Sequence, residues 1–146
     1  MRSSPRRRAR EFVLQGLYQQ QLSGNADDAI RAQLAEATEF PRADREYFTG
    51  LWSGIAREHD ALLARVAPYL DRPPHELSPI ERGILYAAAL ELSRHLETPF
   101  KVVMNEAIEL GKAFGGTDGH RFVNGVLERL ARSLRPVEAA RAKQTA

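Results

Sequence analysis

The sequence predicts an all-α protein, a compact bundle of about six or seven helices in two small subdomains. Three observations support this fold class. Apolar residues recur at helical spacing along nearly the whole chain, and no alternating run indicates a β-strand. Helix start and stop signals separate the apolar runs. A stiff, proline-containing connector at about 68–77 divides the chain into two lobes.

The first lobe holds three expected helices. The first runs from about 6 to about 22 and ends before Gly24. Its apolar residues occupy more than one side, which is typical of a central helix packed by several neighbours. The second helix covers about 27–37. The third starts near 42–44, after Pro41, and runs to about 67, because Pro68 limits it.

The helix after the connector has a strong start signal. Ser78 is an N-cap residue, Pro79 takes the first helical position, and Glu81 completes a capping box. Two side chain–backbone hydrogen bonds are therefore expected at this terminus. An apolar run follows directly, so this helix should lie in the core.

Two further helices are expected. Pro99 opens the first of them, whose apolar face includes Phe114 and which ends at the glycine pair 115–116. Thr117 or Asp118 caps the last helix. Residues 1–136 should thus form one domain, and 137–146 are expected to be a disordered C-terminal tail.

Composition excludes several classes of function. The chain has no cysteine, so disulfides, thiolate catalysis and cysteine-based zinc sites are ruled out. No apolar run approaches the roughly 18 residues of a membrane span, and the basic start does not lead into a secretory signal. The histidines lack ligand spacing, and no glycine-rich phosphate loop is present. We expect a cytoplasmic protein that is not an enzyme, binds no metal or cofactor and does not associate with a membrane.

Charge is distributed unevenly along the chain. The first ten residues hold five arginines and no acid. From Glu11 to Glu128 there are 11 basic and 18 acidic residues. From Arg129 onward there are five basic residues and a single acid, Glu138. Basic ends attract polyanions, while the acidic body offers a surface to another partner.

The arginine cluster is a candidate nucleic-acid contact. Arg6, Arg7, Arg8 and Arg10 carry guanidinium forks that match phosphate oxygens. Residues 1–8 are expected to be a flexible arm that RNA orders by neutralising its charge. Two other interpretations remain open at this point: a solvated terminus, or an arginine-rich targeting peptide.

Phe122 is a candidate base-stacking residue. It falls about 100° from the centre of the apolar stripe of the last helix, next to Arg121. An aromatic ring at the edge of a stripe beside cations suits an unpaired base. Tyr18 is a second candidate, and Asn124 is a polar residue that either links helices or contacts a ligand. The alternative for Phe122 is packing against the other lobe.

Three segments resemble the family of the transcription antitermination factor NusB. Residues 99–115 (PFKVVMNEAIELGKAFG) look like its signature, and residues 120–127 (HRFVNGVL) follow at the expected distance. The arginine-rich start at 6–11 is also similar, and the match spans about 6–135. The resemblance implies a NusB-like fold of two small bundles around a shared first helix, with residues 1–136 as one RNA-binding domain.

The resemblance also implies a function. Members bind the boxA element of single-stranded leader RNA together with NusE, a small-subunit ribosomal protein. The complex joins RNA polymerase and suppresses termination, notably on ribosomal RNA operons. The matching RNA-facing positions are Arg6, Arg7, Arg8, Arg10, Tyr18, Asp118, Arg121, Phe122 and Asn124. Glu81, Arg82 and Tyr86 lie on the helix that matches the NusE-binding region. A homodimer is also compatible with this family.

Two other functions compete with this interpretation. A helical protein–protein adaptor with only generic RNA affinity would carry the same basic ends. Similar domains also precede RNA cytosine methyltransferases, but this chain has no cysteine nucleophile, so catalysis of that kind is rejected.

Overall fold

A computed structural model describes residues 4–114 and 116–145, with side chains described for 4–114 and 121–141. The chain is all-α there, which confirms the predicted fold class. None of the described helices is both long enough and apolar enough to cross a membrane. The helices are α1 (Pro5–Ser23), α2 (Asp27–Ala35), α3 (Arg45–Val66), α4 (Pro79–Arg94), α5 (Phe100–Phe114), α6 (Gly116–Leu134) and α7 (Pro136–Thr145), with short 3-10 turns η1 (Phe40–Arg42), η2 (Ala67–Tyr69) and η3 (Pro74–Glu76).

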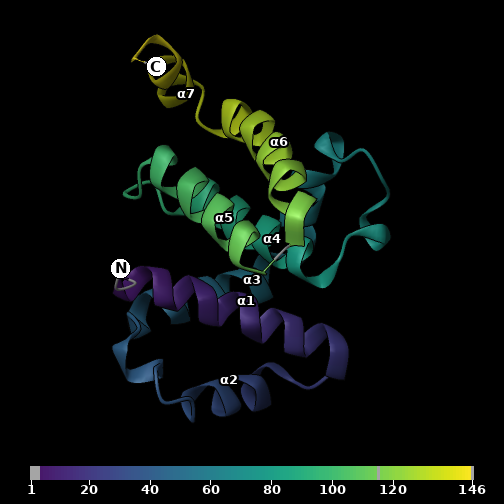
Figure 1. The fold of residues 1–146 in the computed structure, drawn as a ribbon, viewed down its shortest axis with the longest axis vertical. Coiled ribbons are helices and arrows are strands. Elements are labelled where there is room, and N and C mark those ends of the chain that lie inside the picture. Colours follow the sequence, from purple (N-terminus) through teal and green to yellow (C-terminus); the bar gives the residue numbers. More distant parts are fainter. Residues whose placement is uncertain (1–3, 115, 146) are drawn as a thin grey trace.

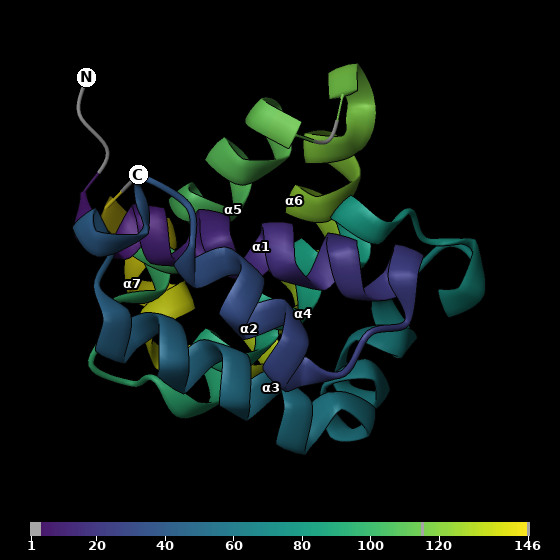
Figure 2. The same ribbon diagram turned by 90° about the horizontal axis from the view of Figure 1, so that it is seen from below.

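Helix α1 lies between two groups of helices (Figure 1). It packs against α2 and α3 on one side and against α4 on the other. Helix α4 in turn contacts α3, α5 and α6, and α5 packs along α6. Figure 2 shows α2 and α3 passing in front of α4 in the view from below. The broad apolar surface predicted for the first helix follows from this central position, because two layers cover it.

The predicted helix starts are largely confirmed. The Ser78 hydroxyl accepts a hydrogen bond from the backbone of Glu81 at 3.1 Å, and the Glu81 carboxylate accepts one from the backbone of Ser78 at 2.9 Å. Asp44 caps α3 through the backbone N–H of Tyr47. Helix α6, by contrast, begins at Gly116, so the predicted capping residues Thr117 and Asp118 lie inside the helix.

Both chain ends are more ordered than the sequence predicted. Helix α1 begins at Pro5, because the Ser4 hydroxyl caps it at the backbone of Arg7 and proline suits the first position. Positions 5–8 of the predicted flexible arm are therefore helical, and 1–3 lie outside the described residues. The tail predicted to be disordered forms α7, where the Glu138 carboxylate accepts a hydrogen bond from the backbone of Phe100 at 3.0 Å.

Helix α3 is not one straight helix as predicted. Glu58 adopts φ −110° and ψ 17°, which interrupts the helical geometry between its two halves. The second half carries Leu62 and Val66 into the core. The kink lies where α3 passes the end of α4, and it places Glu58 beside Arg94.

Arg135, between α6 and α7, closes the end of α4. Its buried guanidinium donates hydrogen bonds to four backbone carbonyl oxygens. The acceptors are Glu91 (2.9 Å), Leu92 (3.0 Å), His95 (2.9 Å) and Thr98 (2.6 Å). A helix leaves its last carbonyls without internal partners, and here a single side chain supplies donors for several of them.

Candidate nucleic-acid interface

The first turn of α1 carries three consecutive arginines. Because helical residues are about 100° apart, their side chains leave the helix in three directions. Arg6 and Arg7 are substantially exposed, and Arg8 is mostly covered. Each guanidinium lies beside a carboxylate from another part of the chain. The pairs are Arg6 with Asp44, Arg7 with Glu106 and Arg8 with Glu39.

The pair between Arg7 and Glu106 has the best geometry of the three. The Arg7 Nε and Nη2 atoms donate to the two carboxylate oxygens at 2.9 and 3.0 Å, which joins the start of α1 to α5. These hydrogen bonds, followed by the charge of Glu106, raise the pKa of Arg7. Arg7 thus stays charged, and an RNA phosphate has to share it with Glu106 or displace Glu106.

Arg10 does not belong to the exposed arginines. Its side chain is 3% exposed and pairs with the equally buried Glu91 of α4, with Nη2 to Oε1 at 2.8 Å and Nε to Oε2 at 3.0 Å. The prediction that Arg10 contacts RNA is therefore wrong. Position 10 lies on the face of α1 that also buries Ala9 and Val13. Burial opposes the charge of Arg10, but the hydrogen bonds and charge of Glu91 raise its pKa.

Tyr47 completes this buried cluster. Its hydroxyl hydrogen-bonds to the Glu91 carboxylate and lies 3.3 Å from the Thr98 hydroxyl. Sequence analysis missed the cluster because its members are far apart along the chain. Glu91 itself offered a signal, since it is the single acid inside the apolar run 83–92 of α4. A buried acid of this kind requires a cation or several donors.

The pKa of Tyr47 leads to a prediction at alkaline pH. Burial first, and then the charge of Glu91 and its hydrogen bond, raise this pKa to about 12. An unfolded tyrosine titrates near about 10, so the folded state holds the proton more tightly. The resulting stability is complete below about pH 10 and is lost as the pH rises from about 10 to about 12. We expect a loss of about 2–3 kcal/mol.

Urea denaturation at about pH 9 and about pH 11.5 measures this loss. Tyr47→Phe is the matched control, because it keeps the ring and removes the titrating group. The difference in unfolding free energy between the two pH values should be larger for the wild type. Equal differences for both proteins would show that other groups cause the alkaline effect.

Two exposed aromatic side chains border one hollow beside α1. Tyr18 is 40% exposed, and Phe114, at the end of α5, is 50% exposed. The hollow has a volume of about 320 Å³, and its floor includes Leu14 and Ile80. The sequence placed Phe114 on the apolar face of its helix, but the helix ends there and leaves the ring uncovered. The site can hold a flat apolar group such as a nucleobase.

Phe122 lies at the edge of the core. The ring is half-buried and packs against the hydrophobic core. It also keeps exposed surface, and the Arg72 guanidinium of the connector lies 4.2 Å from the ring centroid. Arg121 is exposed and Asn124 is half-buried on the same helix. The side chain of Asp118, predicted to face RNA, lies outside the described residues.

The residues predicted to receive a protein partner are mostly engaged within the chain. Glu81 is half-exposed and completes the capping box of α4. Arg82 is half-buried and donates to the carbonyl oxygen of Pro74 at 2.6 Å. Tyr86 is 2% exposed, and its burial raises the pKa of its hydroxyl. Tyr86 is therefore wrong as a surface contact, because the middle of α4 is covered on all sides.

The arrangement contains cations and aromatic rings but no cluster of metal ligands. Among the side chains that the structure describes, no three histidine, aspartate or glutamate residues converge on one point. Arg6 and Arg7 are exposed on the first turn of α1, and Tyr18 is exposed near the other end of the same helix. Phe122 is partly exposed on α6. Cations with neighbouring aromatic rings are typical of single-strand binding surfaces.

Comparison with known proteins supports the resemblance. A profile of the NusB family matches residues 7–132. The chain belongs to the NusB family. It is 56% identical over 144 residues to the transcription antitermination protein NusB of Azoarcus sp. (strain BH72), with 97% of this chain and 93% of that protein covered. It is 52% identical to the protein of the same name from Dechloromonas aromatica (strain RCB), with 97% and 86% covered.

A solved structure from the NusB family agrees with this fold. NusB of T. maritima superposes with a TM-score of 0.81 at 28% sequence identity, and the match covers 97% of this chain and 99% of that one. The likeness therefore includes α7 as well as the two bundles around α1. The family and the fold that the sequence suggested are both confirmed.

Proposed function

We propose that this chain is a non-catalytic transcription antitermination factor that acts in the cytoplasm. It binds boxA in single-stranded leader RNA jointly with NusE, and the complex joins RNA polymerase, notably on ribosomal RNA operons. The observation that carries the proposal is the family match over residues 7–132. This match includes Arg7, Tyr18 and Phe122 and begins one residue after Arg6.

The chemistry of the surface supports RNA as the ligand. Arg6 and Arg7 offer guanidinium groups to phosphates, while Tyr18 and Phe122 offer ring surface to bases. Both kinds of contact are needed for an unpaired strand, because phosphate contacts position it and stacking holds the bases. The start of α4, with Glu81 and Arg82, remains the proposed NusE-binding region.

One observation favours the adaptor as a second candidate. All three arginines of the first turn already pair with acids of the same chain. In an adaptor these pairs would only join α1 to its neighbours, and RNA affinity would be generic. The two candidates differ in whether base sequence and NusE influence the binding.

The deciding experiment is a fluorescence anisotropy titration of labelled boxA RNA and of a scrambled RNA, each with and without NusE. A preference for boxA that increases when NusE is present supports antitermination. Equal affinity for both RNAs, unaffected by NusE, supports the adaptor. Analytical ultracentrifugation of the same samples distinguishes a monomer from the homodimer that the resemblance allows.

Arg7 gives a test of phosphate contact. Arg7→Gln should weaken RNA binding and reduce the slope of log affinity against log salt by about 0.7, the value for one phosphate on a single strand. Glu106→Gln should do the opposite, because it releases the Arg7 guanidinium from its bidentate pair. Salt-dependent anisotropy titrations of both variants measure these effects. If neither variant changes the slope, Arg7 serves only to join α1 and α5.

Phe122 gives a test of base stacking. Phe122→Ala should weaken the binding of boxA RNA by about 1–3 kcal/mol. Phe122→Tyr keeps the ring and should bind almost as tightly as the wild type. Because the ring is half-buried, the thermal midpoint of each variant has to be recorded, and titrations run well below it. If the alanine variant is folded and binds boxA RNA as tightly as the wild type, Phe122 only packs against the core and does not stack on a base.

A further inference from the structure

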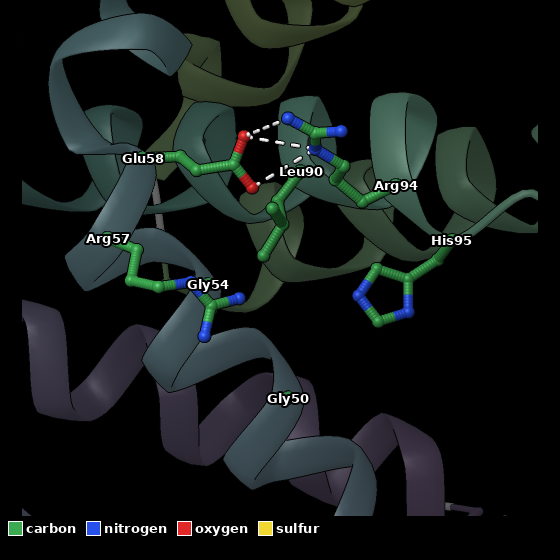
Figure 3. A pocket seen from close by; sticks show the side chains of 7 residues that line it. All are labelled: Gly50, Gly54, Arg57, Glu58, Leu90, Arg94 and His95. Carbon is green, nitrogen blue, oxygen red and sulfur yellow. Dashed lines mark hydrogen bonds and ion pairs between the residues drawn. The ribbon is translucent and has the colours of Figure 1, made fainter.

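A solvent-open cavity of about 540 Å³ lies between α3 and α4 (Figure 3). None of the residues assigned above to RNA or NusE lines it. Its volume is in the range of sites for small ligands. The lining residues are Gly50, Gly54, Arg57, Glu58, Leu90, Arg94 and His95.

Two glycines of α3 shape this cavity. A Cβ atom at Gly54 would lie 2.7 Å from Leu90 Cδ2, so glycine allows Leu90 to pack directly on the α3 backbone. A Cβ atom at Gly50 would meet only His95 Cε1, at 3.8 Å. The space in front of Gly50 is therefore open, and a side chain at that position would fill it.

The charge of the cavity is positive. Glu58 is the only acid that lines it, and Arg94 already binds it, with Nη2 to Oε1 at 2.8 Å and Nε to Oε1 at 3.0 Å. The side chain of Arg57 makes no hydrogen bond or ion pair with any residue that the structure describes. Figure 3 shows Arg57 and His95 extending into the same opening below Leu90. An anion entering there would meet an available guanidinium.

The end of α4 does not oppose an anion as a helix C-terminus usually does. Arg94 is the last residue of α4 and His95 is its C-cap, so the negative end of the helix dipole lies at the cavity. The buried Arg135 binds the carbonyl oxygens of Glu91, Leu92 and His95. Its charge and its donors offset the partial negative charge at this end.

We propose that this cavity binds a phosphate group, held by Arg57 and Arg94. A phosphate has enough oxygens to take the fork of Arg57 and to compete with Glu58 for Arg94, whereas a carboxylate satisfies a single fork. The group could come from a free nucleotide or from an RNA backbone. The second source is compatible with the position of Arg6, whose guanidinium lies 4.6 Å from the Tyr47 ring, while that ring lies 5.3 Å from the His95 ring. The proposal does not depend on boxA or NusE.

The test is isothermal titration calorimetry of the full chain with inorganic pyrophosphate at low ionic strength. The wild type should bind one equivalent. Arg57→Gln should weaken this binding at least about tenfold, which corresponds to one charged hydrogen bond. Gly50→Leu should weaken it strongly without changing the net charge, because leucine occupies the part of the cavity in front of His95. Arg31→Gln, at an exposed position of α2, is the charge-matched control and should bind like the wild type.

Titrations with ATP and with a 20-nucleotide single-stranded RNA identify the source. If Gly50→Leu weakens binding of the RNA, the RNA backbone supplies the phosphate; if it removes only ATP binding, a nucleotide supplies it. Either result supports the site. Three outcomes would overturn it: no saturable binding of pyrophosphate, equal weakening by Arg31→Gln and Arg57→Gln, or tighter binding of an oligoglutamate peptide than of pyrophosphate. Thermal midpoints confirm that each variant is folded.

Discussion

Glu91→Ala is expected to lower the free energy of unfolding by about 3–5 kcal/mol, because it leaves the buried Arg10 guanidinium without its carboxylate. Both side chains are 3% exposed, so water cannot replace the lost partner. Tyr47 also loses the acceptor of its hydroxyl. The loss therefore includes an uncompensated charge and an unsatisfied donor, in addition to the hydrogen bonds of the pair.

Urea denaturation at neutral pH measures this loss, and a double variant separates its causes. Arg10→Met with Glu91→Leu removes both charges and keeps apolar volume, so it should recover most of the stability that Glu91→Ala loses. Replacing Glu58, whose bidentate partner Arg94 is exposed to solvent, should cost below about 1 kcal/mol. A Glu91→Ala protein within about 1 kcal/mol of the wild type would mean that the Arg10 site is hydrated in solution.

Local signals explain why the helices were largely predictable. The capping box at Ser78 and Glu81 needs only four neighbouring residues, and the structure contains both of its hydrogen bonds. The apolar surface on several sides of the first helix likewise predicts its central position. The tail was mispredicted because α7 depends on a distant contact, from Glu138 to the backbone of Phe100.

The site was less predictable, since burial of a charged residue depends on the fold. Arg8 and Arg10 belong to the same cluster in the sequence, yet one pairs near the surface and the other inside the core. Only the direction in which each side chain leaves α1 separates them. Tyr86 was misassigned for a similar reason, because a tyrosine on a helix gives no local sign that neighbours cover it. Family resemblance predicted RNA contacts at Arg8 and Arg10 alike, and it could not distinguish a surface arginine from a buried one.

Arg135→Ala is the second change with a large expected effect. It removes the guanidinium that donates hydrogen bonds to four backbone carbonyl oxygens. We expect the free energy of unfolding to fall by about 3–5 kcal/mol. It also removes the partner of Glu138, at 3.3 Å, whose other oxygen accepts from the backbone of Phe100. The contact between α7 and α5 should loosen, so hydrogen exchange at the Phe100 amide should become faster.

Arg135→Lys distinguishes geometry from charge in this interaction. Lysine keeps the positive charge near the end of α4, but its single ammonium cannot reach all four carbonyl oxygens that lie around the edge of the guanidinium plane. Urea denaturation should therefore place it between the wild type and Arg135→Ala. If lysine restored full stability, the helix dipole alone would account for the effect, and the hydrogen bonds from Arg135 would contribute little. An intermediate value would show that one planar side chain joins the end of α4 to the starts of α5 and α7.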